Sequence, residues 1–266
     1  MNETTTFRWS LEEDIARYAA AGIPALGVWR QKLSDCGQRR AAELIRRHGL
    51  EVSHLHWVGG FTGSEGRSYR ESVEDGREAI LAAAALNARC VVVYTGPRAG
   101  HTFNHAHRLV RDALDELADS AGEHGVTLAI EPMHPGCAEE WTFLTSLDQA
   151  MGLITAVDRP EVGLLFDTYQ LGHEGGIVGR VPEVAPWVAL VQLGDACVPP
   201  TDEQNRCLLG EGRLPLKELV AALLGAGYDG YFDVELLGEA VEPYDYTHLL
   251  DHARRAYEEL VGAHVI

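Results

Sequence analysis

Four oxygen-bearing side chains follow short apolar runs in the second half of the sequence. They are Glu131, Asp167, Gln192 and Glu235, which end runs such as Leu-Ala-Ile and Val-Gly-Leu-Leu-Phe. Three carboxylates and one amide suit a hard or borderline divalent cation. If they converge, they predict a single metal site, because carboxylates gathered without a cation would repel one another. The ligand types favour Mn²⁺, with Mg²⁺, Co²⁺ and Zn²⁺ as alternatives.

Convergence of these side chains requires short strands that alternate with helices. The β-rich apolar runs predict strands at 4–8, 24–29, 50–56, 90–95, 126–131, 162–167, 188–193 and 230–235. The segments between them have apolar residues three and four apart, which indicates helices. We expect these helices at 10–21, 38–48, 69–87, 105–124, 146–156, 215–225 and 247–261. Nearly continuous apolar strands are typical of a parallel sheet that is covered on both faces.

The regular β-then-α alternation predicts an α/β protein with one domain, a (β/α)8 TIM barrel over residues 1–266. In such a barrel the active site lies at the carboxyl ends of the strands, where all four candidate ligands fall. The stretch 172–179 is rich in glycine and predicts a mobile rim loop. It lacks a phosphate-loop pattern, and no dinucleotide fingerprint occurs elsewhere, so we expect no nucleotide cofactor.

Composition narrows the partners that the protein is expected to have. The formal net charge is −18, which disfavours nucleic acid and anionic membrane surfaces. The sequence contains no apolar run long enough to span a membrane. Five cysteines without a Cys-x-x-Cys pair argue against a disulfide framework and indicate a reducing, cytoplasmic location. We therefore expect a small-molecule substrate, with neither nucleic acid nor a membrane as partner.

Two of the motifs carry a family resemblance. The run Leu-Ala-Ile-Glu-Pro-Met-His-Pro at 128–135 resembles the Glu-Pro-Leu-His-Pro segment of the xylose-isomerase-like family of sugar isomerases, epimerases and related lyases. The run at 162–170 resembles that family's Gly-x-x-x-Asp-x-Tyr-His. Segments 191–195, 210–212, 227–231 and 234–235 continue the match in order. The resemblance covers roughly residues 10–260 and is strongest over 126–236.

The resemblance implies a catalytic role for Glu131 and Glu235. In isomerases and epimerases of this type, such a pair binds the metal, flanks the substrate, and moves a proton between carbon atoms or faces. The metal polarises the adjacent carbonyl and stabilises the enediolate that forms. The implied function is a divalent-metal-dependent isomerase or epimerase of a sugar, ketose or polyol ketone, acting on a small polyhydroxy or keto substrate. Members of the family are commonly dimers or tetramers, so the resemblance also implies a homo-oligomer.

Two departures from the family pattern keep an alternative open. The family usually has His where Gln192 stands, and often has His where Gln170 stands. Glutamine at the ligand position occurs in lyases that resemble 3-dehydroshikimate dehydratases. The alternative is therefore a metal-dependent lyase that dehydrates its substrate or eliminates a group β to a carbonyl, as in C-glycoside cleavage. A DNA-repair endonuclease on a related barrel is disfavoured, because it needs more histidine ligands and a basic groove.

Further side chains are candidates for contact with the substrate. They are His56, Trp57, His134, Gln170, His173 and Arg206. His56 ends a predicted strand and Trp57 follows it, and packing at the barrel rim explains both residues equally well. Tyr94 ends the next strand and is expected to cover the same pocket. Asp195, three residues after Gln192, is expected to orient the metal ligands through hydrogen bonds.

Overall fold

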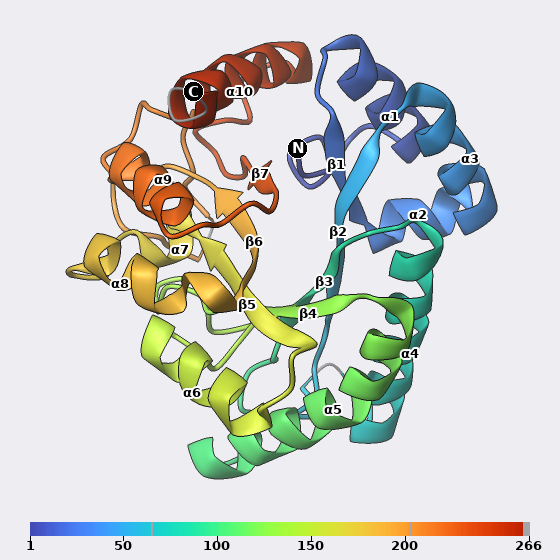
Figure 1. Ribbon diagram of the computed structural model, residues 1–266, viewed down its shortest axis with the longest axis vertical. Helices are drawn as coiled ribbons and strands as arrows, with labels where there is room; N and C mark the ends of the chain where they lie inside the picture. The colour runs from blue at the N-terminus through green and yellow to red at the C-terminus, as the bar shows by residue number, and fades with distance from the viewer. Residues whose placement is uncertain (65, 203, 263–266) are drawn as a thin grey trace.

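The computed structural model describes residues 1–64, 66–202 and 204–262 (Figure 1). Seven parallel strands form one sheet in sequence order, from β1 to β7. The strands are β1 (Ala25–Trp29), β2 (Glu51–Gly59), β3 (Cys90–Tyr94), β4 (Thr127–Ile130), β5 (Val162–Asp167), β6 (Val188–Leu193) and β7 (Phe232–Val234). The sheet curls into a nearly closed barrel with the helices outside it, which confirms the predicted TIM-barrel fold.

The helices follow the strands around the outside of the barrel. They are α1 (Leu11–Ala20), α2 (Arg30–Cys36), α3 (Gln38–His48), α4 (Tyr69–Ala85), α5 (Phe103–His124), α6 (Leu147–Val157), α7 (Thr168–Leu171), α8 (Ile177–Val184), α9 (Leu216–Gly225) and α10 (Tyr246–Val261). A 3₁₀ turn, Ala185–Trp187, leads from α8 into β6. Within the described part of the chain, no helix is both long and apolar enough to cross a membrane.

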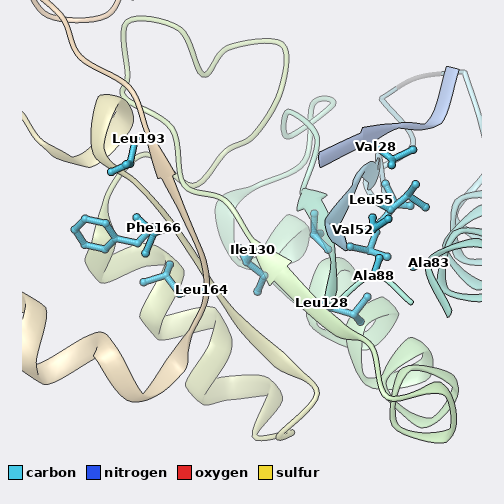
Figure 2. Packing of buried hydrophobic residues seen from close by; sticks show 14 of the residues in the cluster. Val28, Val52, Leu55, Ala83, Ala88, Leu128, Ile130, Leu164, Phe166 and Leu193 are labelled. Atoms are coloured by element: carbon cyan, nitrogen blue, oxygen red, sulfur yellow. The ribbon is translucent and has the colours of Figure 1, made fainter. Parts of the chain in front are cut away.

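Alternation along the strands separates two apolar layers. Leu128, Ile130, Leu164, Phe166 and Leu193 belong to a large cluster that also contains helix residues (Figure 2). The intervening residues Cys90, Val92, Ala129, Leu165 and Leu190 form a smaller cluster inside the barrel. Because side chains point to opposite faces at successive strand positions, the parity of a residue decides whether it faces the helices or the barrel interior.

The predicted first strand at 4–8 is wrong. Residues 3–8 form turns. The N-terminal segment instead pairs with β1 before these turns, through an isolated parallel bridge between Asn2 and Gly27. The Asn2 N–H donates to the Val234 carbonyl at 2.9 Å, so the N-terminal residues lie between β7 and β1 (Figure 1). The hydroxyl groups of Thr4 and Thr6 make side-chain hydrogen bonds, which compete with a strand ladder.

The sequence predicts a loop throughout the glycine-rich stretch 172–179, and this prediction is wrong for its last three residues. Helix α8 begins inside it, at Ile177. Gly176 precedes the helix with a φ of 77°, a left-handed conformation that suits glycine. Three apolar side chains, Ile177, Val181 and Val184, are buried and hold α8 against the barrel. The glycines therefore shape the start of a helix whose apolar face is too short to give a strong periodic signal.

Candidate active site

The four candidate ligands share the inward parity of their strands. Asp167 is the Cα partner of Gln192 in the ladder between β5 and β6. Glu131 and Glu235 come directly after β4 and β7, and their N–H groups donate to Val93 and Leu193 at 3.1 and 3.2 Å. The four side chains are between 0% and 3% exposed. Four neighbouring strands therefore bring these oxygens to one end of the barrel, as the sequence predicts.

Arg206 joins two of these carboxylates. Its Nη2 lies 2.8 Å from Asp167 Oδ2 and 2.7 Å from Glu235 Oε2. Its guanidinium carbon stands 4.2 Å from the centre of the Tyr169 ring, a cation–π distance. The side chain is only 1% exposed. Arg206 is therefore a buried cation that neutralises part of the negative charge of the site.

Asp195 holds the loop that carries Arg206. Its carboxylate accepts hydrogen bonds from four backbone N–H groups, those of Ala196, Gly210, Gly212 and Leu214. The loop is further fixed because the Arg206 N–H donates to the Leu237 carbonyl at 3.1 Å. The contacts of Asp195 therefore support the position of Arg206, whereas the sequence suggests a contact with a metal ligand.

Burial raises the pKa of both glutamates. For Glu131 the pKa lies well above its ordinary value of 4.5, first through burial and then through the charges of Asp167 and Glu235. For Glu235 burial raises the pKa to about 7, against the opposing charge of Arg206. The Thr4 hydroxyl donates to Glu235 Oε1 at 2.9 Å and lowers this pKa. With a pKa of about 7, Glu235 can both take up and release a proton near neutral pH.

Two buried oxygens in the site have no hydrogen-bond partner among residues 1–64, 66–202 and 204–262. They are Oε2 of Glu131 and Oε1 of Gln192. The Gln192 amide group lies 3.5 Å from Asp233 Oδ2 through its Nε2, which leaves its oxygen free. Because buried oxygens without partners are costly, these atoms are suited to a cation that is not part of the polypeptide.

The donor set fits a divalent ion, but Arg206 must leave its contacts with the carboxylates before the ion can bind to them. Within residues 1–64, 66–202 and 204–262, no three His, Cys, Asp or Glu side chains stand at the spacing of a metal site. The Arg206 guanidinium pairs with both Asp167 and Glu235 and so competes with a cation for these carboxylates. With that side chain displaced, three carboxylates and the Gln192 oxygen would be available to hold the ion.

A cavity of about 150 Å³ lies above these groups. Its walls include six predicted site residues, namely His56, Trp57, Glu131, Gln170, Arg206 and Glu235. Tyr94 lines it as well, and the rings of Trp57, Tyr94 and Trp141 pack together with centroids 5.3 to 5.7 Å apart. The cavity thus has a charged floor and an aromatic wall, a combination that suits a polyhydroxy ring with an apolar face.

The predicted histidines have different surroundings. His56 Nε2 is 3.1 Å from the Tyr94 hydroxyl, and burial holds the pKa of His56 well below its usual range, so the ring is neutral. His134 and His173 contact each other, with centroids 5.6 Å apart, and do not line the cavity. The backbone N–H of His134 instead donates to Gln170 Oε1 at 2.9 Å, which helps to orient the Gln170 amide in the cavity wall.

Several cavity residues escape the sequence analysis. They are Thr4, Trp29, Met133, Trp141, Gln204 and Leu237. Trp29 is the last residue of β1, so its place at the carboxyl end of a strand marks it as a candidate in the same way as the four ligands. The others lie in turns and loops, where no periodic pattern marks them. Larger hollows of about 750 and 430 Å³ open near the amino ends of β1 and β2, but lack a group of buried carboxylates.

Comparisons with known proteins agree with this fold. A family model described as xylose isomerase-like TIM barrel matches residues 15–259. An inosose isomerase from Bacillus velezensis is 25% identical, covering 88% of this chain and 86% of its own. A 3-dehydroshikimate dehydratase from Pseudomonas aeruginosa is 23% identical over 89% of this chain, which spans only 37% of that protein. A crystal structure of the IOLI protein with a bound zinc atom has a TM-score of 0.86 at 20% identity, covering 99% of this chain and 97% of that one. Since the family model spans most of the sequence, the chain belongs to the xylose isomerase-like TIM barrel family.

Proposed function

We propose that this protein is a divalent-metal-dependent isomerase or epimerase of a sugar, ketose or polyol ketone. The observation that carries the proposal is the pair of buried glutamates, Glu131 and Glu235, which line one small cavity. Burial raises the pKa of both, to about 7 for Glu235, and perturbed carboxyl groups of this kind are typical of sites that transfer protons. The relatives named above are an isomerase and a dehydratase, so family membership supports an enzyme of the sugar isomerase or epimerase class.

The two glutamates divide the proton transfer between them. One takes a proton from the carbon beside the substrate carbonyl, and the other returns a proton to a neighbouring carbon or to the opposite face. The Arg206 guanidinium lies beside Glu235 and can donate hydrogen bonds to the substrate oxygen that gains charge. The neutral His56 ring and the Gln170 amide, whose Nε2 has no partner in the described part of the chain, can bind hydroxyl groups.

The metal would be held by Glu131, Asp167, Gln192 and Glu235. When bound, it would polarise the substrate carbonyl as a Lewis acid. Mn²⁺ is the ion we propose, because three carboxylates and an amide form a hard oxygen set, with Mg²⁺, Co²⁺ and Zn²⁺ as alternatives. The two unpartnered oxygens of Glu131 and Gln192 support this assignment.

A lyase is the second candidate, and Gln192 is the residue that favours it. It stands where the resemblance leads one to expect histidine, and a dehydratase is among the relatives. The first step is shared, because a lyase also takes a proton from the carbon beside a carbonyl. The outcome then differs: a group on the next carbon leaves, and the second glutamate protonates that group.

Proton NMR in D₂O separates the two candidates. Protein loaded with Mn²⁺ is incubated with ketoses, inososes and keto acids, and the metal is chelated before the spectra are recorded. Loss of the signal of the proton beside the carbonyl, together with a new sugar isomer, supports the isomerase. A new vinyl signal identifies the lyase. Glu235→Gln should abolish either change, whereas Glu51→Gln, at the amino end of β2, should not. Full turnover by Glu235→Gln would refute the proposal.

A further inference from the structure

A second hollow opens directly beside the catalytic cavity. It has a volume of about 480 Å³ and shares three wall residues with the cavity, namely Trp141, Gln204 and Leu237. The catalytic cavity alone is smaller than most small-molecule sites, which measure roughly 300–1,000 Å³, whereas the two spaces together fall within that range. We call the second hollow the outer groove.

The outer groove is aromatic on one side. Phe7 and Tyr246 line it, and their ring centroids are 6.2 Å apart in an edge-to-face arrangement. Phe7 is 42% exposed, one of few large apolar side chains in the described chain with that much exposure. The Arg8 guanidinium carbon stands 4.8 Å from the Phe7 ring centre. An exposed aromatic ring beside a polar active site marks a place where a ligand can be bound.

The boundary that the cavity and the groove share is held in a defined conformation. Gln204 has a φ of 48°, a left-handed backbone that is uncommon for residues other than glycine. Its side-chain oxygen accepts from Arg206 Nε at 3.4 Å. On the other side, a Cβ at Gly238 would lie only 1.6 Å from the Gln204 carbonyl oxygen, so only glycine allows this approach. The boundary is therefore fixed to the arginine that contacts the catalytic carboxylates.

We infer that the substrate has two parts, a polyhydroxy ring in the catalytic cavity and an uncharged aromatic substituent in the outer groove. The inference rests on the proposed function for the ring half. The two spaces adjoin along Trp141, Gln204 and Leu237, so a substituent on a ring bound in the cavity lies beside the groove. Three carboxylates, from Asp202, Glu239 and Glu242, line the groove together with the Arg8 guanidinium, and the excess of negative charge disfavours a substituent that is itself negative. The substrate class is thus an aromatic glycoside or a comparable polyol conjugate.

Matched pairs of glycosides test the inference by binding alone. Phenyl and methyl β-glycosides of glucose, galactose and mannose are titrated into the Mn²⁺-loaded protein by calorimetry. At least one phenyl glycoside should bind about fivefold more tightly than its methyl partner, because one aromatic pair contributes about 1 kcal/mol. Phe7→Ala should abolish this preference and leave the affinity of the methyl glycoside unchanged. Leu81→Ala, which removes an exposed apolar residue of α4, should preserve it.

Equal affinities within every pair, or no binding of any phenyl glycoside, would overturn the inference. So would a preference for phenyl that survives Phe7→Ala. A second copy of the chain is the other possible occupant of the groove, and sedimentation velocity tests for it. If Phe7→Ala turns a dimer into a monomer, the groove is an interface between copies of the chain and the inference is overturned. The proposed reaction is judged separately by exchange in D₂O, so a phenyl preference without exchange would refute only the reaction.

Discussion

Replacement of Arg206 by methionine should destabilise the metal-free protein and make it more responsive to metal. The guanidinium is fully buried and is the cation that pairs with both Asp167 and Glu235. Methionine fills a similar length without charge, so two buried carboxylates lose their partner. Removing one side of a buried ion pair typically costs about 3–5 kcal/mol. We expect the lower end, about 3 kcal/mol, because Glu235, whose pKa burial raises to about 7, can take up a proton.

The loss should be visible as a shift in melting temperature. For a domain of this size, 1 kcal/mol corresponds to roughly 2–4 °C, so the metal-free variant should melt roughly 6–12 °C lower than the parent. Mn²⁺ binds the folded state and raises its stability, by about 2.7 kcal/mol at a hundredfold excess over Kd. Because no guanidinium competes for the site in the variant, Mn²⁺ should raise its melting temperature more than that of the parent. Calorimetric scans with EDTA and with Mn²⁺ measure both effects.

Arg180→Met is the matched control. Arg180 also pairs with two carboxylates, Asp148 and Glu183, but it is about one-third exposed. Exposed pairs contribute at most about 1 kcal/mol, so this variant should melt close to the parent and respond to Mn²⁺ as the parent does. If metal-free Arg206→Met kept the parental melting temperature, or if Mn²⁺ stabilised both proteins equally, the assignment of Arg206 as the competing cation would be refuted.

Three further outcomes follow from the same contacts. The metal-free protein should lose stability as pH rises from about 4.5 to about 7, because folded Glu235 keeps a proton that the unfolded chain releases at its ordinary pKa of 4.5. Urea unfolding at pH 5 and pH 8 measures this loss, and it should shrink in Glu235→Gln; an unchanged loss would contradict the shift. Thr4→Val removes a hydrogen bond that lowers the pKa of Glu235, so more of this carboxyl group is protonated at pH 7. Mn²⁺ affinity at pH 7 should therefore fall about tenfold in a calorimetric titration, the equivalent of about 1.5 kcal/mol. The affinity should recover in part at pH 8, where Glu235 loses its proton. Gly194→Ala would place a Cβ 2.4 Å from Arg206 Nη1, so turnover should fall at least about tenfold for a loss of about 1.4 kcal/mol, and undiminished turnover would show that the guanidinium position is unimportant.

The sequence predicts the floor of the site better than its walls. Glu131, Asp167 and Gln192 follow or end strands with a clear apolar pattern, and strand parity then dictates that they face the barrel interior. Helix α3 coincides with the predicted segment 38–48, since left-handed Gly49 ends it. Local patterns of this kind depend on near neighbours in the chain, which a sequence displays directly.

The walls depend on contacts that no local pattern records. Thr4 reaches Glu235 because the N-terminal residues fill the gap beside β7, at a separation of 231 positions. Trp141 and Leu237 lie in loops whose paths are set by packing against other loops. The bridging position of Arg206 requires the carboxylate of Asp195 to gather its loop. Such arrangements arise from tertiary contacts, so the sequence can name the arginine but not its partners.

The most direct test of the account is a Mn²⁺ titration of the parent protein and its ligand variants by calorimetry. The parent should bind one ion per chain. Glu131→Gln, Asp167→Asn and Gln192→Leu should each weaken binding by more than about 100-fold, because even indirect supports of metal ligands contribute about 10–100-fold. Gln149→Leu, at the start of α6, should bind as the parent does. If the parent bound no Mn²⁺, or if the three ligand variants bound it as tightly as the parent, the metal site at the end of β4 to β7 would be contradicted.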